Sequence, residues 1–181
     1  MKYEKSIILK NGKECLIRNA VGDDAQEVLN IFLLTHEQTD FLSSYKDEAT
    51  LDTTFEKQFL TEKECMDREI YLCAIVDGRI VGTAGADSKG KNKVEHRAEF
   101  GIAIDKEFWG MGIGGALTKA CIECAKNAGY SQLELEVVSD NNSAITLYKN
   151  MGFVEFGRNP RGFISRYLGW QELVLMRLEL N

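Results

Sequence analysis

A glycine-rich run between a strand-like segment and a long helical pattern constrains the fold more than any other feature of the chain. The run, residues 108–117, reads FWGMGIGGAL and holds four glycines in six positions. Glycines let the backbone approach a ligand with no Cβ in the way, and the unpaired N–H groups at the start of the next helix point into the same space. Such a strand, loop and helix are typical of a pyrophosphate site.

The same glycines also fit the dinucleotide fingerprint. Gly110, Gly112 and Gly115 have its spacing, and Glu136 follows about 20 residues later, where that fold keeps a ribose-binding acid. However, residues 105–109 separate the apolar run from the first glycine, whereas the fingerprint follows a strand directly. Only one clear strand and helix unit remains after the run. An NAD(P)-binding oxidoreductase therefore stays an alternative that nucleotide binding would test.

The composition fits one domain with a substantial core. The chain has 181 residues, 44% of them hydrophobic, and a lone proline, so no proline-rich linker divides it. We therefore expect a single domain over residues 1–181. The net charge of −6 argues against a general binder of nucleic acid or of an anionic membrane, because either needs a basic face. An acidic surface suits cationic substrates instead.

The termini and the cysteines predict a cytoplasmic protein. The first residues are rich in charge and no long apolar stretch follows them, so neither a signal peptide nor a membrane span is expected. The five cysteines are odd in number and irregularly spaced, which fits reduced thiols. Cys121 and Cys124 lack a second pair and a nearby histidine, so we interpret them as small core residues one helical turn apart and expect no metal site.

Hydrophobic periodicity predicts alternating strands and helices. The dipeptides Asn11-Gly12 and Asp77-Gly78 are preferred two-residue turns for hairpins. Strands are expected over residues 6–10, 13–18, 70–76, 79–86, 94–104, 133–138, 153–158 and 172–180. Helices are expected from a cap at Asp23-Asp24 to about residue 35, within 46–67, from the glycine loop to Gly129, and from Asn141 or Asn142 to residue 150.

Two further details of this pattern concern the second helix and a lysine-rich loop. In the second helix, Leu51, Phe55, Phe59 and Leu60 would form one packed face. Lys89, Lys91 and Lys93 fill the loop before the strand at 94–104. Such lysines are more often solvated, with contact to the phosphates of a bound cofactor as the alternative.

Two motifs resemble the GCN5-related N-acetyltransferase (GNAT) superfamily. Its signature is a strand, Arg/Gln-x-x-Gly-x-Gly/Ala, a helix, a strand, and Asn-x-x-Ala-x-x-Leu-Tyr-x-x-x-Gly-Phe. Residues 109–114, WGMGIG, match the first motif, and residues 141–153, NNSAITLYKNMGF, match the second almost completely. Trp109 departs from Arg/Gln, at a place where the family binds pyrophosphate chiefly through backbone amides. The resemblance covers residues 70–158. It implies a mixed α/β (α+β) fold, a bent and mostly antiparallel sheet of about six or seven strands flanked by about four helices.

The resemblance implies acetyl-CoA as co-substrate and no metal. In the family two neighbouring strands splay apart, and the backbone before the glycine loop pairs with the pantetheine arm; this maps to Ile102, Ala103 and Ile104, with residues 137–139 across the gap. The pyrophosphate would lie on the loop residues Trp109, Gly110, Met111, Gly112, Ile113, Gly114 and Gly115. Asn141 is a helix cap, and we expect that it also reaches the cofactor.

The catalytic residues implied by the resemblance are Tyr148 and Glu99. Tyr148 matches the family's tyrosine acid near the thioester sulfur, and its alternative role is a core aromatic residue. Strand alternation places Glu99 on the face opposite Phe100 and Ile102, where a partly buried carboxylate would have a raised pKa suited to a base. His96 and a water chain are the other candidate bases.

The resulting hypothesis is an acetyl-CoA-dependent N-acetyltransferase in which a primary amine attacks the thioester directly. The acceptor is a small amine, an amino acid or a peptide N-terminus. Its site would be formed by acids and aromatics of two connections, namely Glu37, Asp40, Glu48, Phe41, Tyr45, Phe163, Tyr167 and Trp170. The alternatives are a non-catalytic acyl-CoA-binding sensor or regulatory module and a transferase of longer acyl groups. A homodimer is possible, since dimers are common in the resembled family.

Overall fold

The computed structural model describes residues 2–48, 52–88 and 90–180. Within these ranges, eight strands form one sheet in the order β1-β2-β3-β4-β5-β6-β8-β7. The strands are β1 (Glu4–Ile8), β2 (Glu14–Asn19), β3 (Ile70–Val76), β4 (Arg79–Ser88), β5 (Arg97–Ile104), β6 (Gln132–Val138), β7 (Val154–Ser165) and β8 (Gly169–Glu179). The α-helices are α1 (Ala25–Gln38), α2 (Thr53–Cys65), α3 (Ile113–Asn127) and α4 (Asn142–Asn150). The mixed class is confirmed, and the eight strands match the number expected from the hydrophobic pattern, one or two more than the resemblance implies.

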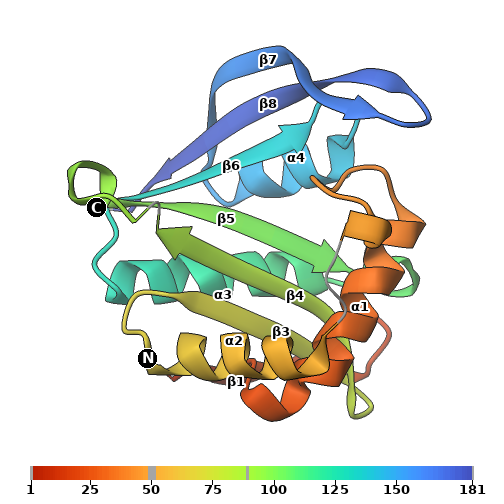
Figure 1. Cartoon of the computed structure of the whole chain (residues 1–181), viewed down its shortest axis with the longest axis vertical. Coiled ribbons are helices and arrows are strands. Elements are labelled where there is room, and N and C mark those ends of the chain that lie inside the picture. The colour runs from red at the N-terminus through yellow and green to blue at the C-terminus, as the bar shows by residue number, and fades with distance from the viewer. Residues whose placement is uncertain (1, 49–51, 89, 181) are drawn as a thin grey trace.

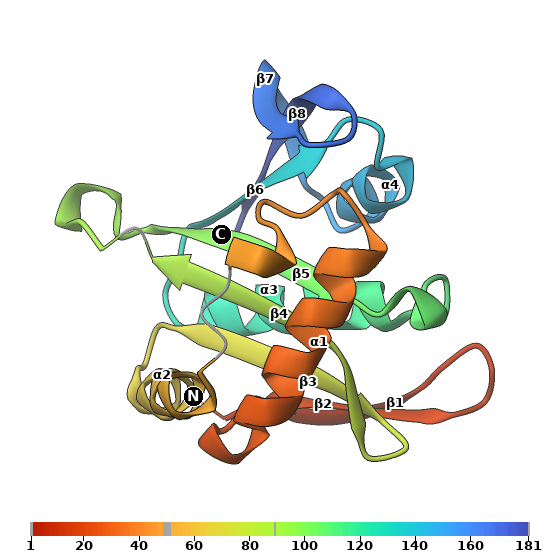
Figure 2. The same ribbon diagram turned by 45° about the vertical axis from the view of Figure 1, so that its right-hand side comes forward.

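All neighbouring strands pair antiparallel except β5 and β6, which are parallel. Helices α1 and α2 lie on one face of the sheet and α3 lies on the other (Figures 1 and 2). Strand alternation sends Leu72, Phe100 and Leu133 into the core on the α3 side. A smaller core on the other face joins α1 and α2, where Ile31 and Leu60 are buried.

The two predicted hairpins differ in their turns. Asp77 and Gly78 both have positive φ, 51° and 78°, which is the two-residue turn that the sequence predicts between β3 and β4. Between β1 and β2 the strands stop at Ile8 and resume at Glu14, so five residues form the connection and only Gly12 has positive φ. The predicted two-residue turn is therefore wrong, and the longer loop projects toward the glycine-rich run (Figure 2).

The first two helices depart from the sequence prediction in detail. The Asp24 side chain makes no cap; its carboxylate accepts hydrogen bonds from Arg18 and from the Val21 N–H. Asp52 caps α2 by accepting from the N–H groups of Thr54 and Phe55. In α2, Leu60 is buried as predicted, but Phe55 is 61% exposed. Leu51 and Lys89 lie outside the described residues. None of the described helices is both long and apolar enough to cross a membrane.

Candidate active site

A gap opens in the sheet between β5 and β6. The two strands pair only at Arg97–Gln132, Ala98–Leu133 and Glu99–Glu134, although they continue to Ile104 and Val138. The Asp105 N–H donates to the Val81 carbonyl, and backbone groups of alternate residues point to opposite sides of a strand. Ile102 and Ile104 therefore direct their N–H and C=O groups toward β6, at positions where no ladder forms. This is the splayed pair that the resemblance implies.

The glycine loop lies at the end of β5 and leads directly into α3. Gly110 and Gly112 have φ of 74° and 103°, which L-residues rarely adopt, and Gly112 is the N-terminal cap residue of α3. No side chain caps this helix, so its first N–H groups are available to a ligand. Gly114 has another reason to be glycine, because a Cβ there would lie 3.2 Å from Leu147 of α4. The loop thus combines two backbone turns with close helix packing.

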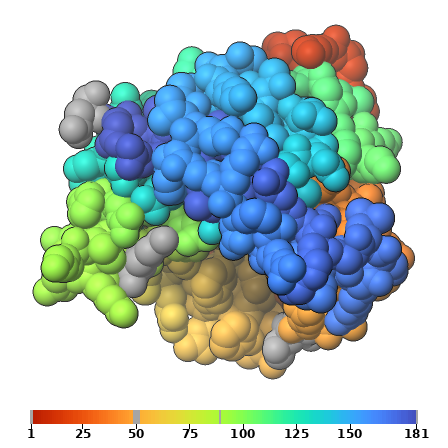
Figure 3. Space-filling view, turned by 90° about the horizontal axis from the view of Figure 1, so that it is seen from above, coloured from red at the N-terminus to blue at the C-terminus, as the bar shows by residue number. Residues whose placement is uncertain are grey.

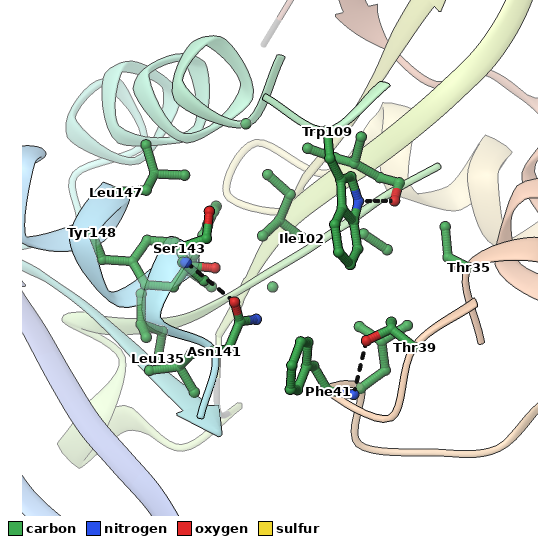
Figure 4. A pocket seen from close by; sticks show the side chains of 18 of the residues that line it. Thr35, Thr39, Phe41, Ile102, Trp109, Leu135, Asn141, Ser143, Leu147 and Tyr148 are labelled. Carbon is green, nitrogen blue, oxygen red and sulfur yellow. Dashed lines mark hydrogen bonds between the residues drawn. The ribbon is translucent and has the colours of Figure 1, made fainter. Parts of the chain in front are cut away.

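The gap and the glycine loop open into one cavity of about 840 Å³. Figure 4 shows Trp109 and Phe41 on one side of this space and Leu147 and Tyr148 on the other. Most of the predicted cofactor residues line it: Ile102, Ala103, Ile104, Trp109, Gly110, Gly112, Gly114, Gly115, Asn141 and Tyr148. Met111 and Ile113 do not line it. Ile113 is only 1% exposed because its side chain faces the core.

Trp109 contributes its side chain to the site. Its indole N–H donates to the Ile104 carbonyl at 2.8 Å (Figure 4). That carbonyl is the last one of β5 that points toward the gap, so the tryptophan satisfies it where no strand can. The indole remains 44% exposed and forms a wall of the cavity. The indole of Trp109 therefore holds the Ile104 carbonyl at the edge of the gap, at the position where the family motif has Arg or Gln.

Helix α4 brings Asn141 and Tyr148 to the cavity. Asn141 caps α4 by accepting from the Ala144 N–H at 3.2 Å, and its side chain lies at the cavity (Figure 4). Tyr148 is 6% exposed, and its ring packs against Phe100 and Phe153. Burial raises the pKa of Tyr148 to about 12. The tyrosine is thus both a core aromatic residue and a cavity residue that stays protonated at neutral pH.

Carboxylates from β4, β5 and β6 line part of the cavity. Glu99 lies between Asp87 of β4 and Glu134 of β6 in the strand register. Asp87 pairs with Lys63, and Glu134 pairs with Arg97 at 2.9 Å. Glu99 is exposed instead of partly buried, so the burial that the sequence prediction relied on is absent. It does line the cavity, as Asp87 does.

Several other candidates lie away from the cavity. His96 is exposed in the turn before β5, at the end of the strand opposite the glycine loop, and does not line the cavity. Lys91 and Lys93 belong to the same distant turn. Since β5 has eight residues at about 3.3 Å each, this turn lies roughly 25 Å from the glycine loop. These two lysines are therefore not placed to contact phosphates on that loop.

The predicted acceptor residues divide into two groups. Phe41 and Phe163 line the cavity, whereas Tyr45, Tyr167 and Trp170 do not. The acids that the sequence suggested for attracting an amine do not line it either. They hold segments together: Glu37 pairs with Lys46, Asp40 accepts from Ser165, and Glu48 pairs with Arg166. The contacts of Asp40 and Glu48 join the segment after α1 to the β7–β8 hairpin, seen in Figure 3 where the orange and blue surfaces meet.

Some cavity residues were missed by sequence reasoning. Those outside the motifs are Lys10, Thr35, Thr39, Leu42, Ser43, Ser88, Phe108 and Leu135. They come from five separate segments, and no periodic or spacing signal connects them. Asp87 and Glu136 also line the cavity. Of these, only Glu136 had been considered, as part of the dinucleotide alternative.

Two cysteines of α3 take the core positions that the sequence predicts. Cys121 and Cys124 are buried on the face of α3 that meets the sheet, and all five thiols are free. Burial raises the pKa of both thiols, so they stay protonated at neutral pH. Among the described residues, no group of three or more His, Cys, Asp or Glu side chains could hold a metal ion.

Comparisons with known proteins agree with this geometry. The chain matches the acetyltransferase (GNAT) family over residues 30–153. It is 32% identical over 146 residues to the uncharacterized N-acetyltransferase MJ1207 of Methanocaldococcus jannaschii, across 79% of this chain and 62% of that protein. It is 29% identical over 143 residues to the L-amino acid N-acetyltransferase AaaT of Escherichia coli, across 77% of this chain and 83% of that protein.

Solved structures show the same fold. The GNAT family acetyltransferase of Streptococcus pneumoniae superposes with a TM-score of 0.87 at 30% identity, covering 92% of this chain and 99% of that one. A phosphinothricin acetyltransferase of Sinorhizobium meliloti, solved in complex with acetyl-CoA, has a TM-score of 0.79 at 18% identity, covering 97% and 90%. The chain belongs to the GNAT acetyltransferase family, as its two motifs predicted.

Proposed function

We propose that this protein is an acetyl-CoA-dependent N-acetyltransferase that acts on a primary amine in a ternary complex, within a single domain over residues 1–181. One observation carries the proposal: the gap between β5 and β6 opens into the same cavity as the glycine loop and Tyr148. An extended pantetheine arm needs such a gap, and a pyrophosphate needs such a helix start. The membership in the family and the neighbour solved with acetyl-CoA support this use of the cavity.

The backbone of β5 would bind and polarise the co-substrate. Ile102 presents an N–H and a C=O toward the gap, and Ile104 presents an N–H, since its carbonyl is held by Trp109. These groups can pair with the amides of the pantetheine arm as another strand would. A backbone N–H aimed at the thioester oxygen would also stabilise the negative charge that develops there.

Glu99, or a water molecule that it holds, would remove the proton from the incoming ammonium group. Its carboxylate lies on the face of β5 opposite Phe100 and lines the cavity, among other acids that favour a cation. Deprotonation leaves the nitrogen lone pair free to attack the thioester carbon. The C–N bond then forms, the C–S bond breaks, and the departing sulfur carries the electron pair.

Tyr148 would stabilise the departing sulfur. With a pKa of about 12, its hydroxyl is protonated at neutral pH and can donate a hydrogen bond. Complete transfer to a thiolate whose thiol has an ordinary pKa near 8.5 would cost about 5 kcal/mol. The buried phenol is therefore better suited to hydrogen-bond donation as the C–S bond breaks, with the sulfur proton supplied finally by solvent.

The acceptor class and the compartment are also part of this proposal. The acceptor is a small amine, an amino acid or a peptide N-terminus, and it would bind beside Phe41 and Phe163, which line the cavity; the relative AaaT is described as an L-amino acid N-acetyltransferase. The cytoplasm fits five free thiols, because reducing compartments keep cysteines unpaired.

The test is release of free coenzyme A from acetyl-CoA over a panel of amines, polyamines, amino acids and peptides. The proposal expects turnover with at least one acceptor class and stable acetylated product by mass spectrometry. Tight acetyl-CoA binding without turnover on any acceptor would favour the non-catalytic acyl-CoA-binding module. Absence of acetyl-CoA binding would reject the use of this cavity altogether.

A further inference from the structure

The charges that line the cavity are unevenly distributed. Its acidic residues, Asp87, Glu99 and Glu136, come from β4, β5 and β6. Among the lining residues that the structure describes, Lys10 is the sole cation. It comes from the β1–β2 connection, which is far in sequence from every motif of the site. A single lysine among described lining residues whose other charged side chains are acidic is an unexpected feature of this chain.

The backbone places Lys10 at the glycine loop. Its N–H donates to the Met111 carbonyl at 3.2 Å, and the Asn11 side chain contacts the Met111 sulfur at 3.3 Å. Hydrogen bonds within the connection, from the Leu9 N–H to Lys13 and from the Gly12 N–H to Leu9, fix its shape. The connection is therefore held against the loop that leads into α3, so Lys10 approaches the same space as the start of that helix.

The ammonium group of Lys10 has no carboxylate partner among the described residues, whereas its neighbour does. Lys13, in the same connection, pairs with Asp77 at 2.7 Å, away from the cavity. Lys13 therefore has a structural ion pair, whereas the ammonium group of Lys10 is available to bind an anion. The N-terminus of α3, on the glycine loop that Lys10 contacts, also attracts anions.

We propose that Lys10 binds a phosphate group of coenzyme A, and this inference depends on the proposed use of acetyl-CoA. Backbone N–H groups of α3 would hold the pyrophosphate, and Lys10 would add a full positive charge. Both the pyrophosphate and the 3′-phosphate have the required chemistry, since a lysine ammonium binds phosphate as a point charge. The lysine would also hold the phosphates away from the acidic side of the cavity.

The experiment compares Lys10→Ala, Lys10→Arg and Lys13→Ala with the parent protein. Calorimetry would measure the dissociation constants of acetyl-CoA and acetyl-3′-dephospho-CoA, and kinetics the KM of acetyl-CoA. We expect Lys10→Ala to weaken acetyl-CoA binding about tenfold, as loss of one charge-assisted contact would, with Lys10→Arg restoring most of the affinity. Lys13→Ala should bind as the parent does, which controls for loss of a lysine in the same loop.

The two ligands distinguish the phosphates. Equal weakening for both would assign Lys10 to the pyrophosphate, and weakening only for acetyl-CoA would assign it to the 3′-phosphate. Lys10→Ala that binds both ligands as the parent does, with an unchanged thermal unfolding midpoint, would overturn the inference. If the parent itself binds no acetyl-CoA, the proposed function is at fault and not the lysine.

Discussion

The glycine loop and the acceptor side of the cavity are built from different parts of the polypeptide. In the proposed site, the glycine loop binds through the backbone groups of one continuous segment, residues 110–115, in which Gly110 and Gly112 have φ angles that favour glycine. The proposed acceptor side, formed by Phe41, Phe163 and Glu99, consists of cavity-lining side chains from three distant segments. A site made of backbone groups can be recognised from a short sequence motif. A site made of side chains depends instead on how segments distant in the sequence pack together.

The contrast also predicts how each part tolerates change. Substitutions in the glycine loop alter the path of the backbone, so they remove several contacts at once. Substitutions on the acceptor side remove one contact each, and neighbouring side chains or water replace part of it. Variants of both kinds therefore test whether the two parts of the cavity respond differently.

The largest effect is expected at Gly112, whose φ of 103° is severely unfavourable for a β-branched residue. Gly112→Val should weaken acetyl-CoA binding about 100-fold or more, because a shifted loop loses more than one hydrogen bond to charged phosphate. Gly129→Val is the matched control, since Gly129 follows the other end of α3 with φ of 79° and open space around it. Calorimetry should show lost affinity in the first variant only, and equal affinity loss in both would contradict a local role for the loop.

A smaller effect is expected at Tyr148. Tyr148→Phe should lower kcat about 30-fold, the value of a hydrogen bond to a developing charge, and change the KM of acetyl-CoA little. Tyr71→Phe removes a hydroxyl whose pKa burial also raises to about 12, but from outside the cavity, and should leave kcat unchanged.

The pH profile gives a second test of Tyr148. Burial favours the neutral phenol, so the hydroxyl remains protonated until the pH approaches 12. The kcat of the parent should therefore show no decline due to Tyr148 between pH 7 and 10. A decline in that interval that disappears in Tyr148→Phe would refute the raised pKa.

The next effect is at Glu99 and bears on the identity of the base. Glu99→Gln should lower kcat/KM about tenfold at pH 7, less than a buried base would give, because water can replace an exposed carboxylate. His96→Asn should have no effect, since His96 lies outside the cavity. A loss at His96 with none at Glu99 would exchange the two assignments, and no loss in either variant would favour the water chain.

Much of the fold was predictable because it depends on local patterns. The turn at Asp77-Gly78, the caps of α4 and the strands around the glycine loop are local features, and each was found where it was predicted. The turn at Asn11-Gly12 failed because the connection makes tertiary contacts with Met111, which a dipeptide preference does not include.

The site was predictable to the extent that its residues lie in motifs. Most of the predicted cofactor positions that line the cavity came from two contiguous segments, whereas Lys10 and Thr39 had no signal that would mark them as lining residues. The lysines chosen from the sequence, Lys91 and Lys93, lie at the wrong end of β5, because charge in a loop does not reveal which end of the sheet it occupies. Acids in the segment after α1 were interpreted as substrate contacts, yet they join that segment to the β7–β8 hairpin.

The smallest effect is expected at this junction, at Ser165. Its hydroxyl donates to Asp40 and accepts from the N–H groups of Tyr167 and Leu168, and the residue is 6% exposed. Ser165→Ala leaves those partners unsatisfied and should lower the free energy of unfolding by about 1 kcal/mol. Because Phe163 is two residues away in β7, the KM of the acceptor should rise a few-fold, while acetyl-CoA affinity stays the same.

Arg166→Ala is the control for this last variant, since it loses ion pairs of the same junction that are half exposed and screened by solvent. It should change the unfolding free energy less than Ser165→Ala does. Urea unfolding and acceptor kinetics measure both quantities. If Ser165→Ala weakened acetyl-CoA binding as much as acceptor binding, the two parts of the cavity would be mechanically coupled, and the separation between a backbone site and a side-chain site would fail.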